Sequence, residues 1–381
     1  MDFTISKRQR MFIKEVEKFC RKEVLPGVEE REEKEEFSLD VWKKMAQFGL
    51  TGLCLPREYG GDGANALTTV LGTEAFARAS RDSSLCNSWL SHLLLCAMNI
   101  NELGNDAQKA KYLPALAAGE KIGALGVTEP DAGSDATSMQ TTAKRDGDVY
   151  VLNGSKTFIS NGPIADIILV YATTDPTLRA KGIVSFIVEA DTPGVTLGPA
   201  FKKYGIHASP TGEVFLDDVR VPVENRLTEE GAGFKAMLES LGWERLAFTH
   251  LVGLMDADLQ DAVSYARERV QFGKRIGDFQ FVQGLIAEMK MDLEASRLMA
   301  YHLAGKVDAR ENIALDAALT KTFISEAYQR CADKAVQVFG GYGAMREYAV
   351  GRSLWWSKIT TIGGGTSQVQ RQIIGRMVLG K

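Results

Sequence analysis

The spacing of apolar residues changes twice along this chain, and that change constrains its fold more than any single motif. From residue 5 to 118, apolar side chains recur every three or four positions, as at Met11, Val16 and Phe19, which is typical of helices. Between 119 and 226 the apolar runs are short and β-branched, and helical spacing returns at 233–270, 278–308, 311–339 and 367–379. We therefore expect an α+β chain with an N-terminal helical domain (1–118), a middle β domain (119–226) and a C-terminal helical domain (227–381).

Local signals give this division detail. Ser38 offers a helix N-cap just before Val41, and the charged run 29–36 predicts a solvated helix face or a loop. In the middle domain, Asn153-Gly154, Asn161-Gly162-Pro163 and 191–194 are typical turn sequences, which we expect to separate the strands.

Composition excludes several classes of function. The net charge of −4, with Lys and Arg dispersed, argues against a nucleic-acid partner. The sequence has no apolar run of the ~20 residues that span a bilayer, and its N-terminus has no apolar signal core, so we expect no membrane insertion. The five cysteines form no C-x-x-C pair, which indicates reduced thiols and a cytoplasmic location. Because the histidines show no metal-ligand spacing, we predict no metal site.

The segment Gly126–Asp135 (GVTEPDAGSD) is the clearest candidate for a ligand-binding loop. It combines tight backbone with small hydroxyl and acidic side chains, which a hydrophobic core does not require. Exposed amides and hydroxyls suit a flat, polar ligand that carries phosphates. An ordinary surface turn between two strands would have a similar composition, and this segment alone does not decide between the two interpretations.

Four further segments carry candidate binding chemistry, and each also has a plain structural interpretation. Asn153–Gly162 places Phe158 and hydroxyls beside an Asn-Gly turn, as an ordinary hairpin also would. The cations of 267–275 follow a long helix, where the helix dipole favours them and where they would also suit a pyrophosphate. The segments 337–343 and 362–371 place glycines at a helix end and before a helix start, as stop and cap signals or as an anion site.

Taken together, GVTEPDAGSD, KTFISNG, RVQFGKRIGDFQ, QVFGGYG and GGGTSQVQR resemble the acyl-CoA dehydrogenases, in the same order and over essentially the whole chain. The resemblance implies that family's fold, with a β-barrel-like middle domain and a C-terminal four-helix bundle. It also implies a homotetramer with one FAD per subunit, oxidation of an acyl-CoA thioester to the 2-enoyl-CoA, and transfer of electrons to electron-transferring flavoprotein. The pattern is most similar to the isovaleryl-CoA subgroup.

The resemblance also assigns roles to residues. Phe158 stands where Trp is usual and Gln368 where Glu is usual, and both keep an aromatic face or a polar contact. The residues expected to contact FAD, partly across a subunit interface, are Val127, Thr128, Gly133, Ser134, Phe158, Ile159, Ser160, Arg269, Gln271, Phe272, Gln280, Gln337, Gly340, Gly341, Thr366 and Gln368. Those expected to contact the acyl-CoA are Ser134, Ser209, Arg245, Gly364 and Gly365.

The main departure from the family pattern is Gly364, which stands where most members carry the glutamate that removes the α-proton. Glu244 is the alternative base, because it lies among apolar residues three positions after Leu241 and four before Phe248. Burial makes a carboxylate a better proton acceptor, although a structural ion pair with Arg245 would explain the same residue. The segment Leu241–Leu246 also matches the L-x-x-E-R-L pattern that carries the base in the isovaleryl-CoA and long-chain subgroups.

The sequence leaves substrate and direction open. The glycines at 363 and 364 favour a branched or alicyclic acyl group, because they leave room near the thioester. An enoyl-CoA reductase of the same fold, which runs the reaction in the opposite direction, remains the main alternative. An oxygen-using oxidase and a catalytically silent binding protein are weaker alternatives.

Overall fold

The computed structural model describes residues 5–239 and 241–380. The N-terminal part is helical, and Ser38 caps α3 as predicted, because its hydroxyl accepts the amide of Val41. Most of the charged run at 29–36 lies on α2, so of the two predicted structures, a helix face or a loop, the run forms mainly the helix. The helices are α1 (Lys7–Phe19), α2 (Val28–Lys34), α3 (Leu39–Gln47), α4 (Ala66–Ser80), α5 (Ser83–Leu90), α6 (Met98–Leu103) and α7 (Asp106–Ala117).

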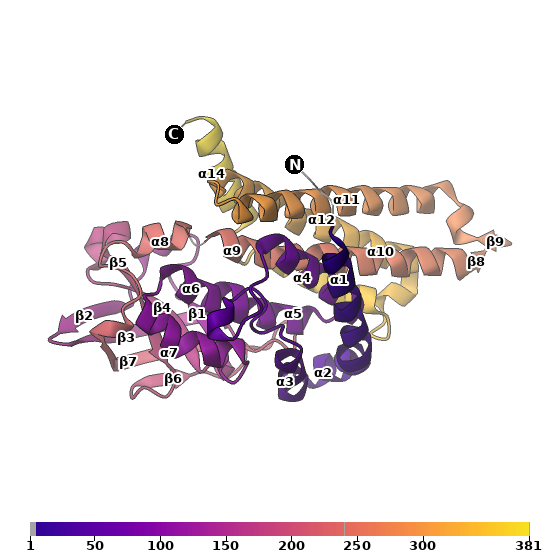
Figure 1. Cartoon of the computed structure of the whole chain (residues 1–381). Helices are drawn as coiled ribbons and strands as arrows, with labels where there is room; N and C mark the ends of the chain where they lie inside the picture. Colours follow the sequence, from indigo (N-terminus) through magenta and orange to yellow (C-terminus); the bar gives the residue numbers. More distant parts are fainter. Residues whose placement is uncertain (1–4, 240, 381) are drawn as a thin grey trace.

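A seven-stranded sheet forms the middle part, and it lies apart from the long helices (Figure 1). Its strands are β1 (Gly123–Gly126), β2 (Thr142–Asp146), β3 (Val149–Ser160), β4 (Ile167–Thr173), β5 (Ile183–Glu189), β6 (Val195–Leu197) and β7 (Thr211–Pro222). The order is β1-β4-β2-β3-β7-β6, with β5 beside β4. β1 and β4 are parallel in the register Gly123↔Ile167, and Gly126 at the end of β1 lies opposite Val170, so the loop after β1 begins beside β4.

One predicted turn is wrong. Asn153-Gly154 lies inside β3, at a register shift against β7, and the turn between β2 and β3 falls at Gly147. A Cβ on Gly154 would lie 2.7 Å from the Cα of Thr141. Glycine at this position therefore allows the close approach of another backbone rather than a reversal of the chain.

The C-terminal part is helical, but the single segment predicted at 233–270 is broken. It forms α8 (Gly233–Glu239), α9 (Leu241–Leu246), a 3-10 turn at Ala247–Thr249 and α10 (His250–Glu268). A short hairpin follows, β8 (Val270–Gln271) and β9 (Lys274–Arg275), and then α11 (Gln280–Asp308), α12 (Ala314–Phe339), α13 (Ala349–Thr360) and α14 (Ser367–Val378). The apolar pattern missed α13 because its buried side includes Ser353, Ser357 and Thr360.

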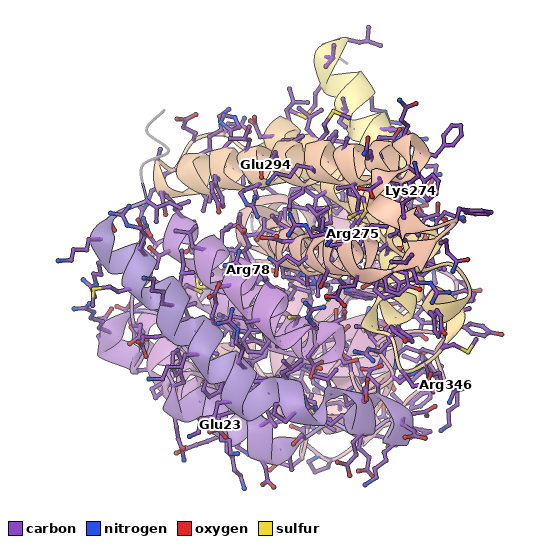
Figure 2. The ribbon with its side chains drawn as sticks, turned by 90° about the vertical axis from the view of Figure 1, so that its right-hand side faces the viewer. Glu23, Arg78, Lys274, Arg275, Glu294 and Arg346 are labelled. Atoms are coloured by element: carbon purple, nitrogen blue, oxygen red, sulfur yellow. The ribbon has the colours of Figure 1, made fainter. Side chains whose placement is uncertain are left out.

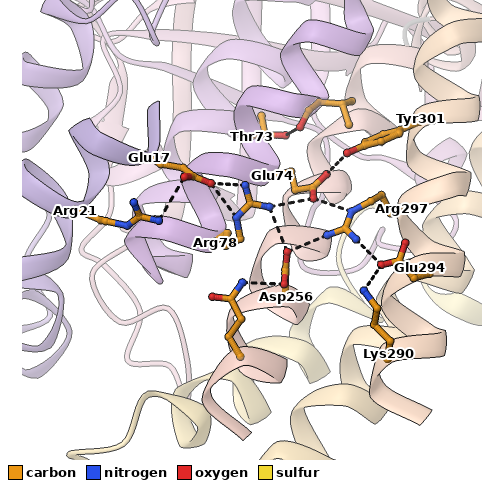
Figure 3. A network of polar contacts seen from close by, with 12 residues as sticks. Glu17, Arg21, Thr73, Glu74, Arg78, Asp256, Lys290, Glu294, Arg297 and Tyr301 are labelled. Carbon is orange, nitrogen blue, oxygen red and sulfur yellow. Dashed lines mark hydrogen bonds and ion pairs between the residues drawn. The ribbon is translucent and has the colours of Figure 1, made fainter. Parts of the chain in front are cut away.

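The two helical parts share one apolar core, while the sheet encloses a second one of its own. A partly buried ion network joins α1, α4, α10 and α11 (Figure 3). In it, Arg297 donates to Glu74 Oε1 over 2.9 Å and to Asp256 Oδ2 over 3.0 Å, and Arg78 pairs with Asp256, Glu74 and Glu17. This network fixes the N-terminal helices against α10 and α11, and so fixes the position of α9. Within the described residues, the structure contains no helix long and apolar enough to cross a membrane.

Candidate active site

A buried ion pair shapes the loop that follows β1. Lys156, on β3, donates to Glu129 Oε1 over 2.7 Å and to the carbonyl of Val127 over 3.2 Å, and its side chain is fully buried. The Glu129 carboxylate also accepts the amides of Gln140 and Thr141. Burial lowers the pKa of Lys156 to about 8. Burial alone would raise the pKa of Glu129, but the ammonium of Lys156 and the Gln140 amide bring it below its usual value.

The loop presents open backbone beside β3. Thr128 lies along the strand, because its carbonyl accepts the amide of Thr157 over 2.9 Å. Gly133 and Ser134 are exposed at the turn, and a Cβ on Gly133 would meet no atom within 4 Å. The next residue, Asp135, pairs with Arg179 over 2.6 Å, which holds the far end of the loop. The backbone between Val127 and Ser134 is therefore firmly supported and open to a ligand.

Phe158 has an exposed side chain and a strained backbone conformation, which suit contact with a flat ligand. Its side chain is 69% exposed, its φ is +57°, and its ring lies 5.6 Å from that of Phe201. A bulky residue in the left-handed region costs on the order of 1–3 kcal/mol and persists mainly at functional sites. Ile159 instead points into the core of the sheet. An exposed, strained aromatic ring next to an open polar loop fits the edge of a planar ring system.

A chain of hydroxyl and amide groups supports the end of β3. Asn87, on α5, donates to Ser160 Oγ over 3.3 Å and to Ser209 Oγ over 2.9 Å, and Ser88 lies 2.9 Å from the same Ser209 hydroxyl. Ser209 is fully buried. The structure therefore places Ser209 behind the strand, where it orients Asn87 and Ser160.

Glu244 lies on α9 and forms the ion pair that was the alternative to its role as a base. Its Oε1 accepts a hydrogen bond from Arg245 Nη1 over 2.7 Å, and the Glu244 side chain is only 14% exposed. Burial, with the Glu244 charge second, raises the pKa of Tyr171 on β4. Tyr171 packs in a small apolar cluster that Val127 also contacts. This cluster brings the carboxylate of Glu244 close to the loop after β1.

The glycines at 363–365 form a turn against Arg245. Gly364 has a φ of +62°, and a Cβ there would lie 2.6 Å from Phe248 Cζ and 3.4 Å from Arg245 Nη1. Phe248 thus fills the space that a side chain at 364 would need. Arg245 is the shared neighbour that joins Glu244 to this turn, so the structure brings together both positions considered for the base.

A separate hollow of about 470 Å³ lies at the other end of the chain's C-terminal part. Four residues predicted to contact the cofactor line it: Arg269, Gln271, Gly340 and Gly341. A Cβ on either of these glycines would meet no atom within 4 Å, so their backbone is open to a ligand. The guanidinium of Arg269 lies 5.6 Å from the ring centre of Tyr342. Cationic, amide and aromatic groups around open backbone suit a nucleotide with its phosphates.

Within one chain, the predicted cofactor residues fall into two separate groups. The β8–β9 hairpin projects at the end of α10 and α11 opposite the sheet (Figure 1), and its residues Lys274 and Arg275 are labelled in the view that faces this end (Figure 2). Phe272 on this hairpin is 94% exposed, and Gln280 and Gln337 are exposed as well. Thr366 caps α14 by accepting the amide of Val369, and Gln368 is exposed in the first turn of the same helix. A single ligand could therefore use both groups only if a second copy of the chain supplied one of them.

The residues fit a dinucleotide with a planar ring better than a metal. The first group offers open amides, hydroxyls and an exposed aromatic edge, and the hollow offers a cation and open glycine backbone. In the part of the chain that the structure describes, His, Cys, Asp and Glu side chains form no cluster of three or more that could hold a metal ion.

Comparison with known families agrees with this geometry. The models of the acyl-CoA dehydrogenase N-terminal, middle and C-terminal domains match residues 6–120, 124–219 and 231–379. The chain belongs to the acyl-CoA dehydrogenase family. The family and the fold predicted from the sequence are thus confirmed.

Three curated relatives match over nearly the full chain. The short-chain-specific acyl-CoA dehydrogenase of Megasphaera elsdenii is 41% identical over 100% of both proteins. The isovaleryl-CoA dehydrogenase of Oryza sativa subsp. japonica is 40% identical over 97% of this chain and 90% of that protein. A subunit of the caffeyl-CoA reductase–Etf complex of Acetobacterium woodii is 39% identical over 99% of both. These similar identities single out no acyl-chain subgroup.

Two solved structures superpose closely. The butyryl-CoA dehydrogenase of Megasphaera elsdenii has a TM-score of 0.96 at 40% identity and covers 100% of both chains. The FAD complex of PigA has a TM-score of 0.96 at 35% identity and covers 99% of both.

Several residues around the site were not predicted from the sequence. The polar groups next to predicted site residues are the partly buried Asn87 and the buried Tyr171, Lys321 and the pair of Glu129 with Lys156. Glu129 lies in the motif GVTEPDAGSD and Lys156 in the motif KTFISNG. A charged residue within each motif is the signal from which their buried pair could have been predicted. The other three lie in ordinary apolar segments, where nothing local distinguishes them.

Proposed function

We propose that this chain is an FAD-dependent acyl-CoA dehydrogenase in which Glu244 removes the α-proton of the thioester. The observation that supports this most directly is the position of Glu244, a largely buried carboxylate held by Arg245 against the side-chain-free turn at Gly364. A largely buried carboxylate is a suitable acceptor for a carbon-bound proton, because burial favours its protonated form.

In the proposed reaction, Glu244 takes the proton from the α-carbon, and the β-carbon gives up its hydrogen with the bonding electron pair. When bound, FAD supplies the two-electron redox chemistry as the acceptor of that hydride. The acyl group becomes the α,β-unsaturated thioester. Arg245 orients the Glu244 carboxylate, and Phe248 with the turn at Gly364 and Gly365 forms the wall beside the acyl chain.

The proposed cofactor site spans two copies of the chain. Val127, Thr128, Gly133, Ser134, Phe158 and Ser160 would hold the flavin ring of FAD, while the hollow lined by Arg269, Gln271, Gly340 and Gly341 would hold the nucleotide end of a second copy's FAD. Exposed apolar side chains along the hairpin and α11 support this assembly. They include Phe272 at 94% and Phe281 at 93% exposure. Chains with such exposed patches usually bury them against another protein, here within a homotetramer.

Electron-transferring flavoprotein is the proposed electron acceptor, and the relationship to a subunit of a reductase–Etf complex supports it. A cytoplasmic location is proposed as well. Its support is that Cys20, Cys54, Cys86, Cys96 and Cys331 are all free and buried thiols.

The same relationship favours one second function, the reduction of an enoyl-CoA. The relative from Acetobacterium woodii is named a caffeyl-CoA reductase, and it is as similar in sequence as the relatives named dehydrogenases. The site residues proposed here would serve either direction, because Glu244 can return a proton as well as take it.

Anaerobic titration of the purified holoenzyme tests the function and its direction together. The flavin absorbance should bleach with a subset of acyl-CoAs drawn from a panel of straight, branched and alicyclic chains. A flavin that no saturated acyl-CoA bleaches, but that an enoyl-CoA reoxidises after chemical reduction, would favour the reductase. A protein that purifies without FAD and does not bind it would contradict both functions.

Glu244→Gln tests the base. Proton transfer by a positioned side chain contributes ~10²–10⁴-fold, so flavin reduction should slow by that order while acyl-CoA binding persists. The exposed Glu224→Gln serves as the matched control. Reduction at the normal rate in Glu244→Gln would place the base elsewhere.

A further inference from the structure

Lys321 is a buried cation that the proposed reaction does not yet use. It lies on α12, its side chain is fully buried, and its Nζ donates to the carbonyl of Gly365 over 2.8 Å. The ring centre of Phe248 lies 5.1 Å from the same nitrogen. Among the described residues, no carboxylate lies within ion-pair distance of Lys321. Burying an ammonium group without a carboxylate partner costs free energy, so we expect Lys321 to have a specific function.

The contacts of Lys321 lead directly to the proposed base. Gly364 and Gly365, with φ values of +62° and +81°, form the turn that Lys321 binds, and Gln370 Nε2 donates to the Gly364 carbonyl over 3.2 Å. A Cβ at Gly364 would lie 3.4 Å from Arg245 Nη1, the atom that donates to Glu244. Lys321 is therefore connected to the Glu244 carboxylate through the turn at Gly364 and Gly365 and the guanidinium of Arg245.

The charges around Lys321 are also unbalanced. Burial first, and then the Arg245 charge, lower the pKa of Lys321 to about 7, while Glu326 and Glu244 act in the opposite direction. Glu326, on the same helix, is bound by Arg371 of α14 through contacts of 2.6 and 2.7 Å. Glu244 is bound by Arg245 and Glu326 by Arg371, so Lys321 pairs directly with neither carboxylate.

We propose that Lys321 is a positioning residue for α-proton abstraction, which holds the turn at 363–365 against Arg245 and Phe248 and so fixes the carboxylate of Glu244. This proposal rests on the proposed function. Lys321 touches neither the substrate nor the reacting atoms, and it acts through Gly365 and Arg245. Without Lys321, the carbonyl of Gly365 loses its buried hydrogen-bond donor. The turn at 363–365 would then no longer hold Arg245 and Phe248 in place, and Arg245 would no longer fix Glu244.

Lys321→Met tests the hydrogen bond, because methionine keeps the length of the side chain and removes the donor. Lys334→Met is the matched control on the same helix, since Lys334 is also largely buried but pairs with Glu288. A 3-thiaacyl-CoA has no β-hydrogen to transfer, so exchange of its α-protons in D₂O reports proton abstraction alone. We expect Lys321→Met to slow this exchange, and flavin reduction by a saturating acyl-CoA, on the order of 10²-fold. FAD content and acyl-CoA affinity should stay close to the wild-type values. Exchange at the wild-type rate, or a loss equal to that in Lys334→Met, would overturn the proposal.

Lys321→Gln keeps a donor for Gly365 and removes the charge, and it serves if the methionine variant fails to fold. With one positive charge fewer beside Glu244, the acid limb of the pH–rate profile for exchange should move to higher pH. Because the pKa of Lys321 is lowered to about 7, its charge is present mainly below that pH. An acid limb at the wild-type pH in Lys321→Gln would overturn the proposal. Failure of the proposed function looks different, because wild-type protein would then neither exchange α-protons nor reduce its flavin with any acyl-CoA.

Discussion

Gly364 illustrates how a single position can exclude a side chain. The family resemblance places a glutamate there, but Phe248 occupies the space and the backbone φ is +62°. A glutamate added at 364 would collide with the Phe248 ring and carry left-handed strain. The side chain at 248 therefore has to be small before the turn can carry a base.

This reasoning gives a test of the geometry at 364. Gly364→Glu should not rescue Glu244→Gln by itself, but the triple change Glu244→Gln, Phe248→Ala and Gly364→Glu should reduce flavin about tenfold faster than Glu244→Gln. Stopped-flow reduction measures this, with Glu244→Gln combined with Phe248→Ala as control. Equal rescue without the change at Phe248 would show that its ring is no obstacle.

Asp258 gives a second residue-level prediction, this one for stability. Its Oδ1 accepts from Ser353 over 2.8 Å, its Oδ2 has no partner, and burial raises its pKa from 3.8 to about 7. Between these two values the folded protein binds more protons than the unfolded chain, so stability falls as the pH rises from about 4 to about 7. Asp258→Asn should therefore raise the melting temperature at pH 8 and change it little at pH 4. Calorimetry at both pH values measures this, with the exposed Asp333→Asn as control, and a gain that does not depend on pH would contradict the assignment.

At the scale of elements, the ion network between α4, α10 and α11 includes the buried carboxylate of Glu74 (Figure 3). Glu74 is buried and accepts from Arg297 and from the Tyr301 hydroxyl, which lies 2.7 Å away. Arg297 keeps Asp256 and Glu294 as partners when the Glu74 charge is removed, so the loss is smaller than for an isolated buried pair.

Glu74→Gln should lower the free energy of unfolding by roughly 1.5–3 kcal/mol, because Arg297 and Tyr301 lose a charged hydrogen-bond acceptor. Urea denaturation of the holoenzyme measures this. Glu294→Gln is the control, because Glu294 also pairs with Arg297 but is 44% exposed, and should cost less than about 1 kcal/mol. Equal losses in the two variants would mean that burial does not strengthen the Glu74 pair.

At the scale of the whole molecule, the two groups of cofactor residues lie at opposite ends of one chain, so assembly and cofactor binding should be coupled. Arg269→Ala removes a charge-assisted contact worth roughly 1.5–3 kcal/mol, which should weaken FAD retention about 10- to 100-fold. Equilibrium dialysis and light scattering measure retention and oligomer size, with Arg220→Ala on β7 as control. FAD retention unchanged by Arg269→Ala would contradict the nucleotide site in the hollow.

A tetramer should also depend on the exposed apolar side chains at the start of α11. Phe281→Asp places a charge on a side chain that is 93% exposed in the single chain. We expect smaller particles that hold less FAD, because a buried charge at an interface opposes association. Tetramers with full FAD content would show that Phe281 lies outside any interface.

Local patterns along the chain predicted the order of helical and β parts, the cap at Ser38, the loop Gly126–Asp135 and the burial of Glu244, because these depend on residues that are near one another in sequence. Spacing and turn chemistry failed at Asn153-Gly154, where glycine serves a close backbone approach, and at α13, whose buried side is partly polar. The meeting of Glu244, Arg245, Gly364 and Lys321 could not be read from the sequence, since it depends on how α9, α12 and the turn before α14 pack together. Packing sets which distant groups share a buried space, and burial then sets their charges; local sequence determines neither.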